Sequence, residues 1–80
     1  MTIEEVFGVV LKKYRNQMGL SQEVLAFKSG LDRTYISLLE RGKRKPTINP
    51  VFAIAIILNE RPSKLIKEVE DLLSCESNKE

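Results

Sequence analysis

Residues 22–41 read QEVLAFKSGLDRTYISLLER and hold side chains whose types and spacing could bind the edges of base pairs. An arginine can donate paired hydrogen bonds to guanine O6 and N7, hydroxyl groups can bond to bases or phosphates, and apolar groups can contact the methyl group of thymine. All three kinds of group follow Asp32, on what we expect to be the outer face of a helix. The candidate base-reading residues are Arg33, Thr34, Tyr35, Ser37 and Leu38.

A basic loop follows this segment. The residues from 1 to 45 carry nine Lys or Arg against five acids, whereas the residues from 46 to 80 carry four against six. Such an asymmetry suits a polyanionic partner. Because the loop comes directly after the reading segment, we expect its basic residues to bind phosphates. These are Arg41, Lys43, Arg44 and Lys45, with Lys12, Lys28 and Ser21 as weaker candidates.

Two short helices joined by a turn at residues 29–31 would position these side chains. Ala26 is small enough for the helices to approach closely, and Gly30 permits the sharp turn. Four apolar residues would face a shared core: Leu25, Leu31, Ile36 and Leu39. This pattern is typical of a DNA-binding helix-turn-helix. The alternative is an ordinary helical hairpin with a polar surface.

The rest of the chain predicts an all-α fold, a compact five-helix domain over residues 1–73 that contains the helix-turn-helix at 22–41. We expect helices over 3–18, 22–29, 33–42, 48–58 and from 62 or 63 to 73, followed by a frayed polar tail over 74–80. The predicted N-caps are Thr2, in a capping box with Glu5, then Ser21, Asp32 and Thr47. The second helix should bury Val24 and Leu25, and Asn59 should end the fourth in a left-handed conformation.

Several classes of protein are excluded by composition. The chain has one cysteine, Cys75, and no histidine, so zinc has too few soft ligands and Ser-His-Asp chemistry is impossible. The sequence has no glycine-rich phosphate loop, and the acids near Glu68 suit a solvated helix face, so we expect no enzyme, no metal and no cofactor. The longest apolar run, 51–58, is far shorter than the ~20 residues that span a bilayer. Acids at positions 4 and 5 replace the positive charge of an export signal, which indicates a cytoplasmic protein.

From about residue 7 to residue 66 the sequence resembles the lambda-repressor and Cro-like family of helix-turn-helix regulators, also called the XRE family. The resemblance implies that Gln22 touches phosphate and braces a side chain of the reading helix, and that Arg33 and Thr34 contact bases. It also implies a structural ion pair between Arg15 and Glu40. Residues 33–37 of this chain read RTYIS and residues 41–46 read RGKRKP. Small members of the family with these two features resemble controller proteins of restriction-modification systems, which regulate their own operon.

Activation by such a protein needs a contact with RNA polymerase. Glu23 falls where some members of the family present an acid to the polymerase, so it is a possible polymerase contact. Phe27 departs from the second acid that the family pattern has nearby. The sign of regulation therefore stays open.

A homodimer is expected because a chain of this length buries little surface alone and because the predicted fourth helix is apolar all round. Its partner would read a second half-site about 34 Å away in a palindromic operator. The predicted interface consists of Phe52, Ala53, Ile56, Ile66, Val69 and Leu73. The alternative is that the fourth helix is simply the central core helix.

Two other functions use the same fold. One is a small phage-type repressor, and the other is an antitoxin or similar protein-interaction module with its partner on the last two helices. We expect no small-molecule effector, since the chain offers no second domain to sense one.

Overall fold

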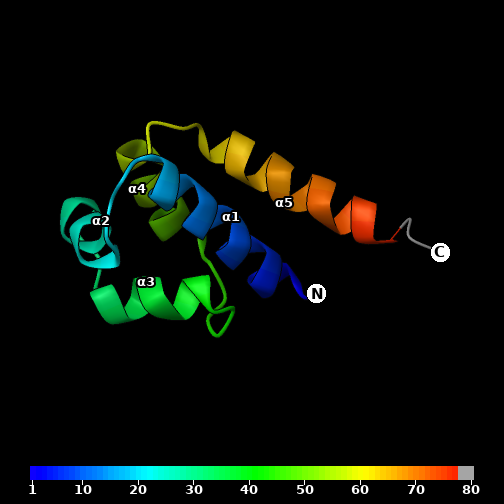
Figure 1. Cartoon of the computed structure of the whole chain (residues 1–80), viewed down its shortest axis with the longest axis horizontal. Coiled ribbons are helices and arrows are strands. Elements are labelled where there is room, and N and C mark those ends of the chain that lie inside the picture. The colour runs from blue at the N-terminus through cyan, green and yellow to red at the C-terminus, as the bar shows by residue number, and fades with distance from the viewer. Residues whose placement is uncertain (78–80) are drawn as a thin grey trace.

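The computed structural model describes residues 1–77, which form five helices and no strand (Figure 1). The helices are α1 (Ile3–Gln17), α2 (Gln22–Ser29), α3 (Arg33–Glu40), α4 (Ile48–Ile57) and α5 (Pro62–Ser77). The predicted all-α, five-helix class is confirmed.

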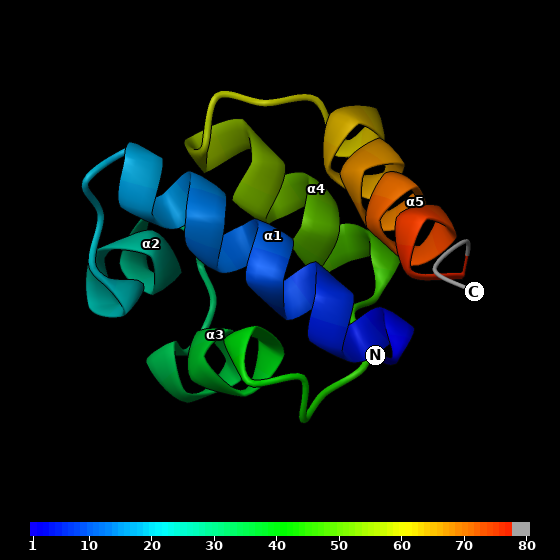
Figure 2. The same ribbon diagram turned by 45° about the vertical axis from the view of Figure 1, so that its right-hand side comes forward.

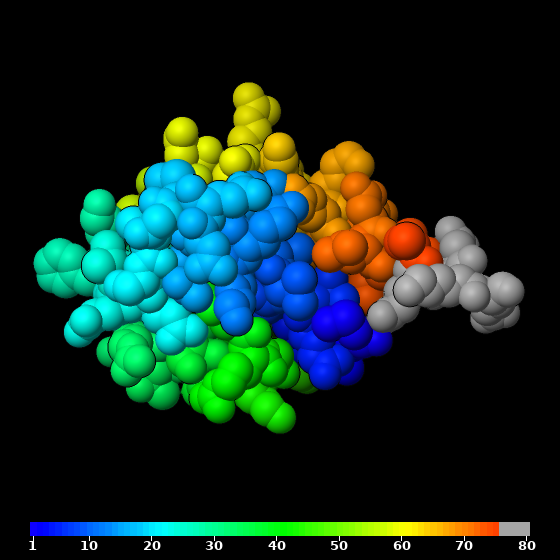
Figure 3. Space-filling model, in the orientation of Figure 1, coloured from blue at the N-terminus to red at the C-terminus, as the bar shows by residue number. Residues whose placement is uncertain are grey.

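Helix α1 crosses the middle of the molecule and packs against both α5 and α3 (Figure 2). Helix α2 packs on α3 and α4, and α4 also contacts α5. Each helix turns apolar side chains into one core, whose largest fully buried members are Phe7, Leu11, Leu25, Ile36, Leu39, Ile54, Leu58, Leu65 and Val10. This packing covers one side of α3 and leaves its other side on the surface of the molecule (Figure 3).

Local signals set most helix ends as predicted. The Thr2 hydroxyl accepts the Glu5 N–H at 3.1 Å, and the Glu5 carboxylate accepts the Thr2 N–H at 2.8 Å, which completes the capping box. Gly30 ends α2 with φ +73°, and Asn59 follows α4 with φ +58°. Both residues adopt the left-handed conformation that closes a helix.

Some predicted ends are wrong. Helix α3 ends at Glu40 because Gly42 has φ +70°, and the Lys43 N–H donates to the Leu38 carbonyl, which turns the chain away from the helix axis. Helix α5 continues to Ser77, since no glycine or proline interrupts it. The last residues of the predicted tail, 78–80, lie outside the described residues.

Other differences concern side chains. Val24 is not buried but 39% exposed, because α2 turns Leu25 and Ala26 to the core instead. Asp32 and Thr47 occupy the N-cap positions of α3 and α4, but neither side chain makes a capping hydrogen bond.

A polar cluster joins α1 to α5. The Tyr14 hydroxyl donates a hydrogen bond to the Glu68 carboxylate, and Lys13 Nζ lies 2.6 Å from Glu68 Oε1 and 4.8 Å from the centre of the Tyr14 ring.

Among the described residues, no helix is long and apolar enough to cross a membrane.

Candidate nucleic-acid interface

The outer face of α3 carries the five residues predicted to read bases. Arg33 and Thr34 are exposed at the start of the helix. Ser37 is half-buried one turn later. Because Ile36 and Leu39 are fully buried on the opposite side, the orientation of this face relative to the core is fixed.

Tyr35 and Leu38 border a hollow beside this face. Both are half-buried, and both line an open depression of about 500 Å³ between α3 and the start of α4. Its lining residues are Gly30, Leu31, Asp32, Thr34, Tyr35, Leu38, Arg44, Thr47 and Pro50. The side chains of Tyr35 and Leu38 therefore line a hollow beside the reading face, and Tyr35 also packs against the core.

A buried polar network fixes the C-terminal end of α3 to α1 and α2. Arg15 Nε lies 2.5 Å from Glu40 Oε2, and Arg15 Nη2 donates to Glu40 Oε1 at 2.9 Å. Gln22 Nε2 donates to the same Oε1 at 3.0 Å, and Arg15 Nη1 donates to the Leu20 carbonyl at 2.8 Å. The Glu40 carboxylate raises the pKa of Arg15, first through these hydrogen bonds. Gln22 thus braces the last residue of α3 from the first residue of α2.

Sequence reasoning missed the role of Gly8. A Cβ atom at this position would lie 2.5 Å from the Glu40 carbonyl oxygen and 2.6 Å from that of Leu39. Both contacts are with backbone, so α1 and α3 can approach this closely only because residue 8 has no side chain. The available signal was a glycine inside an otherwise regular amphipathic helix.

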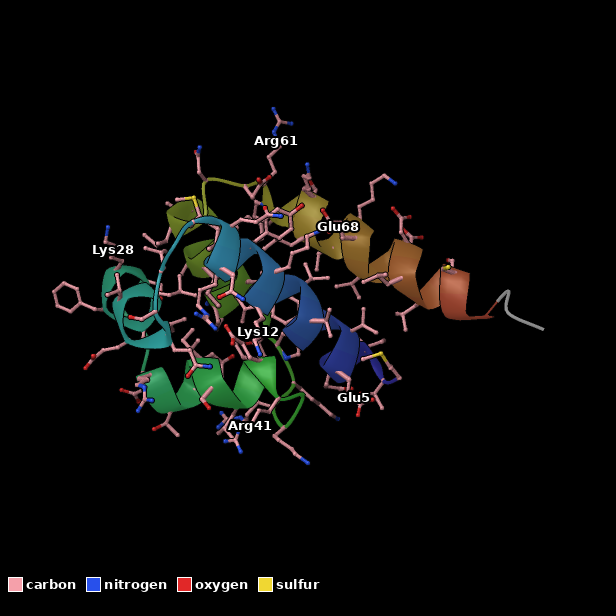
Figure 4. The ribbon with its side chains drawn as sticks, viewed as in Figure 1. Glu5, Lys12, Lys28, Arg41, Arg61 and Glu68 are labelled. Carbon is pink, nitrogen blue, oxygen red and sulfur yellow. The ribbon has the colours of Figure 1, made fainter. Side chains whose placement is uncertain are left out.

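The basic loop lies directly beside α3. Arg41, Lys43, Arg44 and Lys45 are all exposed, and Arg41 points away from α3 on the outer side of the molecule (Figure 4). Arg44 differs from the others, since its Cζ atom lies 5.1 Å from the centre of the Tyr35 ring. The described part of the chain therefore presents four exposed cations in the loop at the C-terminal end of α3.

The three weaker candidates for phosphate binding differ in their position relative to α3. Lys12 extends from α1 on the side of α3, whereas Lys28 projects from α2 away from α3 (Figure 4). Lys28 is therefore not part of the basic surface around α3. The Ser21 hydroxyl accepts the Val24 N–H at 3.1 Å and so serves as the N-cap of α2.

A separate apolar face is formed by α4 and the start of α5. Ile48, Phe52 and Ile56 recur every four residues along α4 and are 68%, 52% and 73% exposed, and Ile66 of α5 is 48% exposed. Phe52 and Ile66 line a mostly apolar hollow of about 360 Å³ together with Ile48, Val51, Pro62, Ser63, Lys67 and Glu70. We call Ile48, Phe52, Ile56 and Ile66 the α4–α5 face.

The predicted interface is corrected in two respects. Val69 is only 6% exposed and belongs to the core, and Leu73 is packed partly against that core, since α5 turns both toward the interior. Ala53 is half-buried. Ile48, which is not among the predicted interface residues, is one of the most exposed members of the face.

These features define a class of protein. Two short helices meet at a left-handed glycine, and the second presents an exposed polar face beside a run of cations. Within residues 1–77 no cluster of His, Cys, Asp or Glu could hold a metal ion. The arrangement is that of a helix-turn-helix DNA-binding regulator.

Comparison with known proteins agrees with this class. The helix-turn-helix family model matches residues 11–65, so the chain belongs to the helix-turn-helix family. It is similar to the control protein C.SmaI of Serratia marcescens, with 42% identity over 66 residues, which are 82% of this chain and 79% of that protein. It is also similar to the control protein C.BamHI of Bacillus amyloliquefaciens, with 35% identity over 96% of this chain and 95% of that one.

A solved structure extends the likeness. The crystal structure of the restriction-modification controller protein C.AhdI from Aeromonas hydrophila superposes with a TM-score of 0.76 at 42% identity. The match covers 78% of this chain and 94% of the other.

Proposed function

We propose that this protein is a homodimeric regulator that binds an inverted-repeat operator through α3 and controls the operon of a restriction-modification system, including its own expression. The observation that carries the proposal is that Arg33 and Thr34 are exposed at the start of α3 and that four exposed cations follow the last residue of the same helix. Two of the similar proteins are named control proteins and the third is named a restriction-modification controller protein, and these names support the operon.

In this proposal the two groups of side chains have different tasks. Arg33 and Thr34 contact base edges, with Tyr35, Ser37 and Leu38 completing the contact surface, because only groups on α3 can enter the major groove. Gln22 and the loop residues Arg41, Lys43, Arg44 and Lys45 bind phosphates, which sets affinity and register without selecting sequence.

The α4–α5 face supports the homodimer. Four large apolar side chains are exposed on adjacent helices, three of them around an apolar hollow, and a second copy of the chain would cover them. A two-fold contact uses the same face on both copies, and in the proposed dimer the two α3 helices contact the same side of the DNA.

Regulation would follow the concentration of the protein in the cytoplasm. Dilute monomers bind weakly, and operator occupancy rises steeply once dimers form. Glu23, exposed in the first turn of α2, is a possible contact with RNA polymerase if the protein activates.

Selection of bound sites from random duplex DNA tests the proposal. At about 150 mM salt, where non-specific binding is weak, we expect recovery of an inverted repeat with half-sites about one helical turn apart. Recovery of a single unrepeated half-site would contradict the dimer. If the folded protein enriches no sequence, a protein-interaction module that binds a partner through the α4–α5 face replaces this function.

A further inference from the structure

We infer that Arg44 is a positioning residue for Tyr35: its guanidinium lies over the tyrosine ring and holds that ring at the edge of the reading face. This inference rests on the proposed DNA-binding function. It gives Arg44 a task that Lys43 and Lys45, its neighbours in the basic loop, do not share.

The path of the backbone brings the two residues together. Gly42 adopts φ +70°, its N–H donates to the Leu39 carbonyl at 3.1 Å, and the Lys43 N–H donates to the Leu38 carbonyl at 2.9 Å. This turn reverses the chain at the end of α3. Residue 44 therefore returns along the side of the helix and reaches Tyr35, nine positions earlier in the sequence.

The contact itself has the geometry of a cation–π interaction. Arg44 Cζ lies 5.1 Å from the centre of the Tyr35 ring, inside the ~6 Å range of this interaction. A planar guanidinium can lie flat on an aromatic ring and still present N–H groups at its edge, whereas a lysine ammonium is a point charge. Arg44 can thus hold the ring and remain available to a phosphate.

The surroundings of Tyr35 explain why its ring needs to be held. One part of the side chain packs against the core, but the ring also borders the 500 Å³ depression between α3 and α4, where neighbouring atoms leave space. Within residues 1–77 the Tyr35 hydroxyl has no hydrogen-bond partner that would fix it. Arg44, which lines the same depression, restricts the ring from the side of the loop.

The consequence concerns specificity. If Arg44 were only a phosphate ligand, its removal would weaken binding to every duplex by the same factor. Because it also positions a side chain of the reading face, its removal should weaken binding to the selected operator more than binding to random DNA. At an exposed site the stacking accounts for an additional loss of about two- to fivefold on the operator alone.

The test compares Arg44→Ala with Lys45→Ala, a variant that removes one charge from the same loop without touching Tyr35. Affinity is measured for the duplex recovered by selection and for a scrambled duplex, each across a range of salt concentrations. We expect both variants to lower the salt slope by about 0.9, and only Arg44→Ala to lower the ratio of specific to non-specific affinity. In a Tyr35→Leu background the additional loss of affinity for the operator should vanish. Arg44→Lys keeps the positive charge, so it should restore the salt slope more fully than it restores the ratio of specific to non-specific affinity.

A second measurement needs no DNA. The described aromatic residues include two tyrosines, Tyr14 and Tyr35, whose ring-proton resonances can be assigned by NMR. In Arg44→Ala the Tyr35 resonances should shift, while those of Tyr14, on the far side of α1, should stay unchanged. Lys45→Ala should leave both unchanged.

The outcomes are separable. Unchanged Tyr35 resonances in Arg44→Ala, or equal losses on both duplexes for Arg44→Ala and Lys45→Ala, would overturn the role of Arg44 and leave the regulator intact. If the wild-type protein selects no sequence, the proposed function fails, and the NMR comparison still decides whether Arg44 holds Tyr35.

Discussion

Arg15 and Glu40 form a bidentate ion pair that connects α1 to the last residue of α3, the reading helix. Arg15 Nε lies 2.5 Å from Glu40 Oε2, and Nη2 lies 2.9 Å from Oε1. The two side chains are only 11% and 3% exposed. Because a buried pair repays its desolvation only when the geometry is good, its main effect is to fix how α3 sits on α1.

Removal of one partner should therefore be costly. We expect Glu40→Ala to lower the free energy of unfolding by about 3–5 kcal/mol, since Arg15 would remain buried without its counter-charge. Urea denaturation followed by circular dichroism measures this loss. The double variant Arg15→Met with Glu40→Leu removes both charges and should recover most of the stability, and a double variant less stable than Glu40→Ala would show that the pair itself is strongly stabilising.

A methyl group at position 8 should separate α1 from α3. Its Cβ would meet two backbone carbonyl oxygens at 2.5 and 2.6 Å, and neither can move without shifting α3. We expect Gly8→Ala to cost about 1–3 kcal/mol, although alanine favours helices. Val9→Ala, on the exposed side of the same helix, is the matched control and should change stability by only about 0.5 kcal/mol. An unchanged melting temperature for Gly8→Ala would contradict the close packing.

Reading and phosphate binding should separate by mutation. Arg33→Ala should remove most discrimination between operator and random DNA, at a cost of about 1–3 kcal/mol on the operator. Lys43→Ala should weaken binding to both duplexes and reduce the salt slope by about one unit. Fluorescence anisotropy at several salt concentrations measures both effects, and an equal loss on both duplexes for Arg33→Ala would remove it from the reading residues.

A charge on the α4–α5 face should prevent dimer formation. Phe52 and Ile56 are 52% and 73% exposed, so glutamate at either position is tolerated by the monomer and disfavoured in an apolar interface. We expect Phe52→Glu and Ile56→Glu to give folded monomers in sedimentation velocity. Phe27→Glu is the control, because Phe27 is 85% exposed on α2, away from this face. A dimer that survives both substitutions but dissociates in Phe27→Glu would move the interface to α2.

The cluster between α1 and α5 predicts a pH dependence of stability. Donation to Glu68 and burial raise the pKa of Tyr14 to about 12, while hydrogen bonds from Lys13 and Tyr14 lower the pKa of Glu68. The Tyr14 contribution is therefore complete below its ordinary pKa of 10.0 and is lost as pH rises towards 12. The Glu68 contribution is complete above its ordinary pKa of 4.5 and is lost as pH falls through the lowered value.

Thermal unfolding across pH checks this expectation. The difference in melting temperature between the wild type and Tyr14→Phe should be constant from about pH 6 to 9 and should shrink on both sides. In a Glu68→Gln background this difference in melting temperature should no longer shrink at acid pH, because the carboxyl group that titrates there is absent. A difference that does not change between pH 9 and 12 would contradict the raised pKa of Tyr14.

The sequence by itself determined the features that depend on neighbouring residues. The Thr2–Glu5 capping box, the left-handed residues Gly30 and Asn59, and the exposed start of α3 follow from local hydrogen bonding, backbone freedom and helical periodicity. These signals act over three or four positions, so they can be read without knowing the fold. The motif and its class came from the same local information.

Tertiary structure decided the features that join distant segments. Val69 is in the core because α5 lies against α1, and periodicity alone does not say which stripe of an apolar helix the core takes. Gly8 is indispensable only where the α3 backbone crosses it, and Arg44 reaches Tyr35 only because the chain reverses at Gly42. These relationships depend on how helices pack and where loops return, which are properties of the whole core and not of any local pattern.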